Sequence, residues 1–353
     1  MAPVGVGFAD KLQAPTRVWS IGPLAKGETV MGFAVGPGGP TFTGPHVDSQ
    51  TGSVFSATRS VVFAGNRLVL ALSKGRRNSE GGQFPERIYE LLSLDTQTGE
   101  VKETREIAAF RPVHLFATND SHVIVAGRTV LRVTPDLNDS GAFDYHARGQ
   151  QTGKIENMSP DGSTLGNATS PGFELVDART LTATGLTASP SVATSVSSKG
   201  FLTDNVYWYG KYPSDHSFVT YVDTAGDHLI YHGKCGGRPE FLTDDLVLVP
   251  GCKSPLIIDT KGNVVRSLSV KGEFSFAGVS QNGKRVALQV ATYNGVHLLN
   301  RERFVVYSIE TGEPIAEVKP DKLAEGQSWT AFSPDGSMFV VGSPLKLSLY
   351  RLP

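Results

Sequence analysis

The sequence predicts an all-β fold: a seven-bladed β-propeller whose blades are four-stranded antiparallel sheets, with the ring closed by the N-terminal strand. Three observations support this prediction. A hairpin turn recurs along the chain, a second turn follows inside each unit, and the units repeat at about 40 residues, which is typical of propeller blades. The 39 glycines and 21 prolines fit a chain with many turns.

The first element of each unit is a hairpin of the kind seen in residues 330–343, TAFSPDGSMFVVGS. Each hairpin begins with an apolar or small residue, which is followed by Ser, Thr or Ala. A pair of turn residues comes next, and then a short apolar run. Asn, Asp and Gly accept the positive φ angles that tight hairpin turns require. We place the turn pairs at Gly65-Asn66, Asn119-Asp120, Asp161-Gly162, Asp204-Asn205, Asp244-Asp245, Asn282-Gly283 and Asp335-Gly336.

The second element is a strand, a turn rich in Asp, Thr and Gly, and another strand, as in LLSLDTQTGEVKETREI and LIIDTKGNVVRSLSV. Each unit therefore offers four strands, A to D. A single propeller domain over residues 1–353 follows, with blades at about 54–107, 110–148, 152–189, 193–233, 236–270, 272–318 and 325–353 plus 16–24.

Ring closure follows from the last unit, which supplies only three strands before the chain ends. Residues 16–24, TRVWSIGPL, can supply the missing outer strand. This arrangement removes an unpaired sheet edge, which would otherwise invite aggregation. We expect a monomer.

The composition of the chain argues against some classes of partner. Charged residues make up 19% of the chain and the formal net charge is −1, so nucleic acid is not an expected partner. No apolar run is long enough for a membrane span. The N-terminus, MAPVGVGFAD, has neither the basic nor the apolar region of a signal peptide, although a mature secreted chain would look the same.

The two cysteines, Cys235 and Cys252, fall on the predicted A and B strands of the fifth unit, about two positions from direct opposition. We predict a disulfide between them, with two free buried thiols as the alternative. A disulfide favours an oxidising compartment, so we expect a secreted or periplasmic protein, while a cytoplasmic location stays open.

The FSPDG turn followed by an apolar strand resembles the WD40-like and related bacterial seven-bladed β-propellers, as an architecture. The resemblance implies that the A–B and C–D turns lie on one face of the ring. The B–C and D–A connections then lie on the other face, where the central channel opens to ligands. The Trp-Asp and Gly-His marks of WD40 repeats and the Trp-bearing repeat of quinoprotein propellers are absent, and no cofactor is assigned.

The long connections all fall between strands B and C or between D and A. They comprise residues 26–53, 73–87, 210–217 and 291–303. Loops held on a rigid frame are where binding and catalysis usually occur. We therefore expect a site at this mouth of the channel, with neutral variation of surface loops as the alternative.

Candidate ligand-binding residues at that mouth are Arg59, Lys199, Arg238, Trp329, Tyr293 and Arg77. Guanidinium and ammonium groups suit carboxylate or phosphate oxygens, and aromatic rings can stack on a flat ligand. Candidate acid–base residues are His114, Glu156, Glu240 and His297. For any one of these residues, a structural ion pair in a water-filled channel is the simpler explanation.

No motif completes a catalytic or metal site. The chain has no His-Glu-x-x-His, no Cys-x-x-Cys and no Gly-x-Ser-x-Gly, and Glu156, Asn157 and Glu240 form an incomplete metal-ligand set, so no metal is assigned. Two hypotheses remain. The first is a module that binds a small polar molecule or a protein at the channel mouth. The second is a hydrolase or lyase that acts there on a polar, carbohydrate-like or ester substrate.

Overall fold

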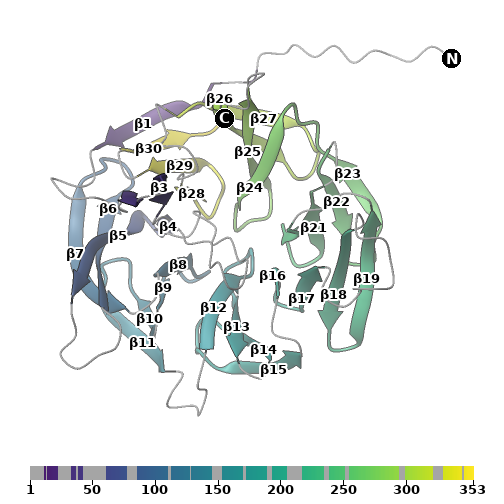
Figure 1. Ribbon diagram of the computed structural model, residues 1–353, viewed down its shortest axis with the longest axis horizontal. Helices are drawn as coiled ribbons and strands as arrows, with labels where there is room; N and C mark the ends of the chain where they lie inside the picture. Colours follow the sequence, from purple (N-terminus) through teal and green to yellow (C-terminus); the bar gives the residue numbers. More distant parts are fainter. Residues whose placement is uncertain are drawn as a thin grey trace.

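The computed structural model is a ring of β-sheets around a central channel (Figure 1). It describes residues 12, 14–22, 33–36, 39–42, 61–77, 86–109, 113–127, 129–144, 153–169, 172–188, 193–204, 217–233, 238–250, 254–293, 299–320, 329–343 and 346–353. In this part of the chain every regular element is a strand, and no helix is long and apolar enough to cross a membrane.

The described strands form seven four-stranded antiparallel sheets, which confirms the predicted fold class. Blades 1 to 3 consist of β4 (Val61–Ala64), β5 (Arg67–Arg77), β6 (Glu86–Asp95) and β7 (Val101–Ala109); β8 (His114–Ala117), β9 (Val123–Ala126), β10 (Thr129–Val133) and β11 (Asp139–Asp144); and β12 (Gly153–Met158), β13 (Thr164–Thr169), β14 (Phe173–Asp177) and β15 (Ala183–Ala188).

Blades 4 to 6 follow the same order from the inner to the outer strand. They consist of β16 (Ser195–Val196), β17 (Phe201–Asp204), β18 (Ser217–Asp223) and β19 (Gly226–Gly233); β20 (Glu240–Phe241), β21 (Leu246–Val249), β22 (Leu256–Asp259) and β23 (Val264–Ser267); and β24 (Glu273–Val279), β25 (Arg285–Tyr293), β26 (Leu299–Ser308) and β27 (Pro314–Val318).

Blade 7 confirms the closure by the N-terminal strand. Its strands from inside to outside are β28 (Trp329–Phe332), β29 (Met338–Ser343), β30 (Lys346–Arg351) and β1 (Thr16–Ile21). β1 runs antiparallel to β30, with Thr16 opposite Arg351 and Ile21 opposite Leu347. Trp19 on β1 also donates its Nε1–H to the Thr96 carbonyl of blade 1 at 2.9 Å, so the outer strand of blade 7 is fastened to the next blade.

The core lies between blades. Among the described residues there are seven apolar clusters, one for each pair of neighbouring blades. The cluster between blades 7 and 1, for example, packs Trp329 and Val340 against Phe63 and Leu68. The alternating apolar strands therefore pack face to face around the whole ring.

The A–B turn of blade 4 corrects the sequence prediction. The expected turn at Asp204-Asn205 is wrong, because Phe201–Asp204 is strand B and pairs with β18. The turn lies at Ser197–Gly200, where the Ser197 Oγ accepts hydrogen bonds from the backbone N–H groups of Lys199 and Gly200. A Cβ at Gly200 would lie 2.2 Å from the Val222 carbonyl oxygen, so this turn depends on glycine.

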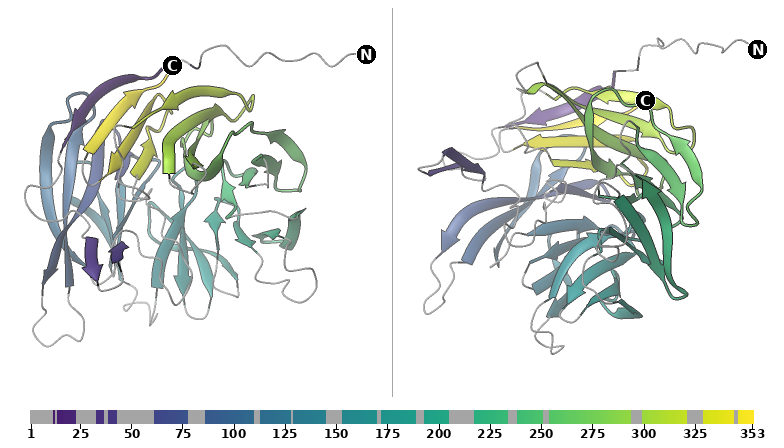
Figure 2. Two further views of the ribbon diagram at one scale, coloured as in Figure 1. Left: turned by 45° about the horizontal axis from the view of Figure 1, so that its top comes forward. Right: turned by 45° about the vertical axis from the view of Figure 1, so that its right-hand side comes forward.

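The connections between strands define two faces. At the turn pole lie the A–B and C–D turns, which are two to five residues long, as in 65–66 and 118–122. The opposite end of the blades, where strands B and D end and strands C and A begin, is the loop pole; the residues that join these ends include 78–85, 205–216 and 294–298, which lie outside the described residues. The β2 (Phe33–Gly36) and β3 (Gly39–Phe42) hairpin interrupts the D–A connection from β1 to β4 and stands off the ring in Figure 2.

Candidate functional site

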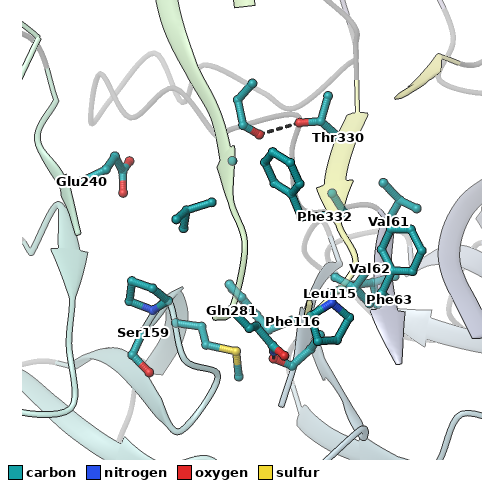
Figure 3. A pocket seen from close by; sticks show the side chains of 18 of the residues that line it. Val61, Val62, Phe63, Leu115, Phe116, Ser159, Glu240, Gln281, Thr330 and Phe332 are labelled. Carbon is teal, nitrogen blue, oxygen red and sulfur yellow. Dashed lines mark hydrogen bonds between the residues drawn. The ribbon is translucent and has the colours of Figure 1, made fainter. Parts of the chain in front are cut away.

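The inner strands enclose a cavity of about 190 Å³ on the channel axis, to which all seven blades contribute (Figure 3). Most of its wall is apolar, for example Val61, Leu115 and Phe332. The polar lining residues among those described are Asn157, Ser159, Ser195, Glu240, Gln281 and Thr330. Thr330 donates its hydroxyl to the Ala277 carbonyl at 2.5 Å, which ties blade 7 to blade 6.

Gln281 narrows the channel at the turn pole. Its side chain extends from the A–B turn of blade 6 and donates to the Ala117 carbonyl of blade 2, at 2.9 Å. Blades 6 and 2 are not neighbours, so this hydrogen bond spans the channel. A Cβ at Gly162 would lie 2.7 Å from both the Ala117 oxygen and the Gln281 Nε2. Access to the cavity from the turn pole is therefore restricted by packed groups.

A polar cluster lies where the chain enters the inner strands of blades 4 and 5. Arg238 donates from Nη2 to Asn157 Oδ1 at 3.0 Å and from Nε to the Thr194 carbonyl at 3.1 Å. The Arg238 Nε also lies 3.2 Å from Glu240 Oε1. Asn157 completes the cluster by donating its Nδ2–H to the Ala193 carbonyl at 3.1 Å. Blades 3, 4 and 5 are thus joined by one guanidinium group.

The members of this cluster differ in how much of each residue is exposed to solvent. Asn157 is 3% exposed, whereas the side chains of Arg238 and Glu240 are 39% and 17% exposed. Figure 3 shows the Glu240 carboxylate on the wall of the cavity, opposite Phe332 and Thr330. Arg238 and Glu240 therefore cross-link the ring while part of each side chain stays exposed.

Lys199 does not belong to the mouth at the loop pole. It lies on the A–B turn of blade 4 at the turn pole, and its Nζ is 2.7 Å from Asp245 Oδ1 of blade 5. The neighbouring Ser198 backbone N–H donates to Asp244 Oδ1 at 2.9 Å. Because the predicted turn was placed six residues too late, Lys199 was assigned to the wrong end of strand A.

Trp329 and His114 are core residues. Trp329 is 1% exposed and packs between blades 7 and 1, so its ring does not present a face to a ligand. His114 is 6% exposed and pairs with Ala126 at the start of β8. Neither residue lines the cavity, although both were placed at its mouth from the sequence.

The remaining sequence candidates are not described at the side-chain level. The backbones of Arg77, Glu156 and Tyr293 belong to β5, β12 and β25. Arg59, His297, Cys235 and Cys252 lie outside the described residues, so the disulfide stays a prediction. In the described part of the chain, no group of three or more His, Cys, Asp or Glu side chains could hold a metal ion.

Sequence reasoning missed Gln281 and Ser195 as channel-lining residues. Gln281 occupies the variable position of the turn SQNG, where Ser159-Pro160-Asp161 and Ser333-Pro334-Asp335 have proline. This difference from proline at the same position of the repeat could have identified Gln281 as a channel-lining residue. Ser195 gave no such signal, because the turn of its blade was misplaced.

Comparisons with known proteins support the fold. No protein-family model matches the chain, and no curated protein matches it in sequence. Among solved structures, a chain from the crystal structure of the mitotic checkpoint complex is similar, with a TM-score of 0.54 and 12% identity over 98% of both chains.

Two further structures are the C-terminal WD40 domain of Sif2 and BamB from Moraxella catarrhalis. The first has 10% identity, covers 83% of this chain and 95% of that one, and has a TM-score of 0.44. The second has 12% identity, covers 84% and 83%, and has a TM-score of 0.37. The similarity to the checkpoint-complex chain extends over nearly the whole of both chains, and the seven four-stranded sheets confirm the predicted resemblance at the level of architecture.

Proposed function

We propose that the protein is a binding module that recognises a protein partner at the loop pole, over the channel mouth marked by Arg238 and Glu240. The observation that carries this proposal is the difference between the two poles. All A–B and C–D turns have two to five residues, whereas B–C connections reach the length of 205–216 and one D–A connection holds a whole hairpin, β2–β3. Insertions concentrated on one face of a rigid frame favour recognition on that face.

The size of the cavity favours a protein over a small molecule. Its volume of about 190 Å³ lies below the roughly 300–1,000 Å³ that is usual for small-molecule sites. A partner surface that covers the pole can instead place one or two side chains against Arg238 and Glu240. Charged groups of both signs at the rim would then set its orientation.

Among the described residues, no observation supports the hydrolase or lyase alternative. Glu240 is engaged by Arg238 at 3.2 Å, and His114 is buried away from the cavity. A general acid or base must come within hydrogen-bond reach of the reacting group. We therefore do not propose an enzyme.

Site-specific photo-cross-linking tests the binding proposal in the native host. The photoreactive amino acid p-benzoylphenylalanine replaces the exposed Lys271, which lies at the loop pole just before β24, or the exposed Gln97 in the C–D turn of blade 1. We expect a discrete cross-linked partner from position 271 only, and a lower yield when Glu240→Gln is added. Equal cross-linking from position 97 would exclude a preferred pole.

A further inference from the structure

A second cavity of about 740 Å³ lies at the turn pole, across blade 6. It runs from the outer strand of blade 5, past both turns of blade 6, to the C-terminal residue Pro353. We call it the blade 6 groove. Leu246, Val265 and Ile315 supply apolar lining, and Arg266, Lys284 and Arg285 supply positive charge.

Two of the three cations of this groove have no anionic partner among the described residues. Neither Arg266 nor Lys284 forms an ion pair there, and Glu310 is the one acidic side chain of the lining. Arg285 donates from Nη2 to the main-chain oxygen of the C-terminal residue Pro353 at 2.8 Å, so its charge is partly balanced by the terminal carboxylate. The groove as described therefore has an excess of positive charge.

Two guanidinium N–H groups in the groove are also unsatisfied. The Arg266 Nε and the Arg285 Nη1 are buried and have no hydrogen-bond partner among the described residues. Buried donors are almost always paired in folded proteins, because an unpaired one loses its hydration without compensation. Both guanidinium groups are therefore incompletely paired in the described part of the chain.

The apolar side of the groove continues onto the outer surface of blade 5. Val265 is 41% exposed and the adjacent Val264 is 61% exposed, on the outermost strand of that blade. They are two of the four large apolar side chains that are exposed in the described part of the chain. A free inorganic anion would leave these valines in water, whereas a peptide with an apolar residue beside its carboxylate would cover them.

We propose that the blade 6 groove binds an extended acidic segment of a partner protein. A carboxylate of this segment pairs with Arg266 and Lys284, and a neighbouring apolar side chain packs on Val265 and Ile315. The groove volume is in the range of roughly 300–1,000 Å³ that accommodates a ligand of a few residues. This site is separate from the loop pole, and neither proposal depends on the other.

Fluorescence polarisation with the full chain tests the proposal. The probe is a labelled heptapeptide of alternating Glu and Leu, and the matched probe has Gln in place of Glu. We expect saturable binding of the Glu peptide, and binding weaker by about tenfold or more for Arg266→Glu and for Lys284→Glu, since each reverses a charge in the contact. Lys261→Glu is the control, because Lys261 is exposed on the same face but outside the groove.

Four results would overturn the proposal. Absence of binding, equal binding of the Gln peptide, or equal loss in Lys261→Glu would each rule out recognition of a carboxylate in the groove. Sedimentation velocity gives the fourth: self-association of the wild type that Arg266→Glu abolishes would assign the groove to a second copy of the chain. Melting temperatures of both groove variants ensure that a weaker signal is not a folding defect.

Discussion

At the scale of single residues, the repeated motif is a hydrogen-bond arrangement that recurs in blades 3, 6 and 7. Ser333 donates its hydroxyl to Asp335 Oδ1 at 2.6 Å and accepts from the Met338 N–H at 2.9 Å. Ser159 with Asp161 and Ser280 with Asn282 make the same bond, at 2.5 and 2.7 Å. The glycines that follow, Gly162, Gly283 and Gly336, all have φ near 70°. The motif can therefore be predicted from the sequence, since each hydrogen bond joins residues that are close together in the chain.

Asp335 should make the fold sensitive to acid. Burial tends to raise the pKa of Asp335, but hydrogen bonds from Ser333 and Ser337 outweigh this and hold the pKa below its ordinary value. A lowered folded-state pKa stabilises the protein above the unfolded-state pKa of about 4, and this stabilisation is lost as pH falls through the folded-state pKa. We expect urea unfolding to show a smaller loss of stability from pH 5 to pH 3 in Asp335→Asn than in the wild type.

The exposed Asp227→Asn variant is the control for loss of one negative charge. If the two variants have the same pH dependence, the turn hydrogen bonds do not shift the stability of the fold.

Gln281 should contribute to ring rigidity through its bond across the channel. Replacing it with Ala removes the hydrogen bond to the Ala117 carbonyl, and the free energy of unfolding should fall by about 1 kcal/mol. Amide hydrogen exchange should become faster in the A–B turns of blades 2 and 6. The neighbouring Asn282→Ala variant instead removes the bonds of Asn282 with Ser280 and with the Asp335 carbonyl of the adjacent blade, and it should leave the turn of blade 2 protected.

At the scale of elements, the sequence was most informative where a blade is regular. Six of the seven A–B turns lie where the repeat places them. Blade 4 breaks the pattern because FLTD, residues 201–204, forms strand B there, whereas the same four letters at residues 241–244 lead into the A–B turn of blade 5. The local sequence alone could not distinguish a strand from a turn at these positions.

The candidate site was less predictable than the fold because its contacts join distant residues. Sequence reasoning placed Glu240 near the channel, and Glu240 does line the cavity. It could not show that Arg238 bonds to Asn157, which is 81 residues away on another blade. A single sequence carries no signal for such a contact, since the pairing depends on ring closure.

The A–B turn of blade 4 gives a direct test of the corrected position of Lys199. Because Lys199 and Asp245 form an exposed ion pair, with side chains 55% and 68% exposed, Lys199→Ala should leave the midpoint of urea unfolding nearly unchanged. It should also leave cross-linking from position 271 unchanged. A loss of cross-linking comparable to that caused by Glu240→Gln would show that Lys199 belongs to the binding surface after all.

At the scale of the whole molecule, stability depends on a ring without a free end. Each of the seven apolar clusters joins two blades, and β1 completes the last of them by hydrogen bonding to β30. Trp19 extends this closure to blade 1: it bonds to the Thr96 carbonyl, and its ring covers Gly99, where a Cβ would lie 2.9 Å from the indole. The chain termini therefore stabilise the interface between the first and last blades.

Trp19→Ala should weaken the ring as a unit. The variant loses one hydrogen bond and the packing of a half-buried indole, so the free energy of unfolding should fall by about 2–3 kcal/mol, somewhat less than for a fully buried Trp. Trp19→Phe keeps most of the packing and should lose only about 1 kcal/mol. Guanidinium unfolding measures the loss, and hydrogen exchange locates it. If closure couples the blades, amides of both β30 and blade 1 lose protection together, whereas exchange confined to β1 would mean that this strand is an appendage and the remaining blades hold the ring without it.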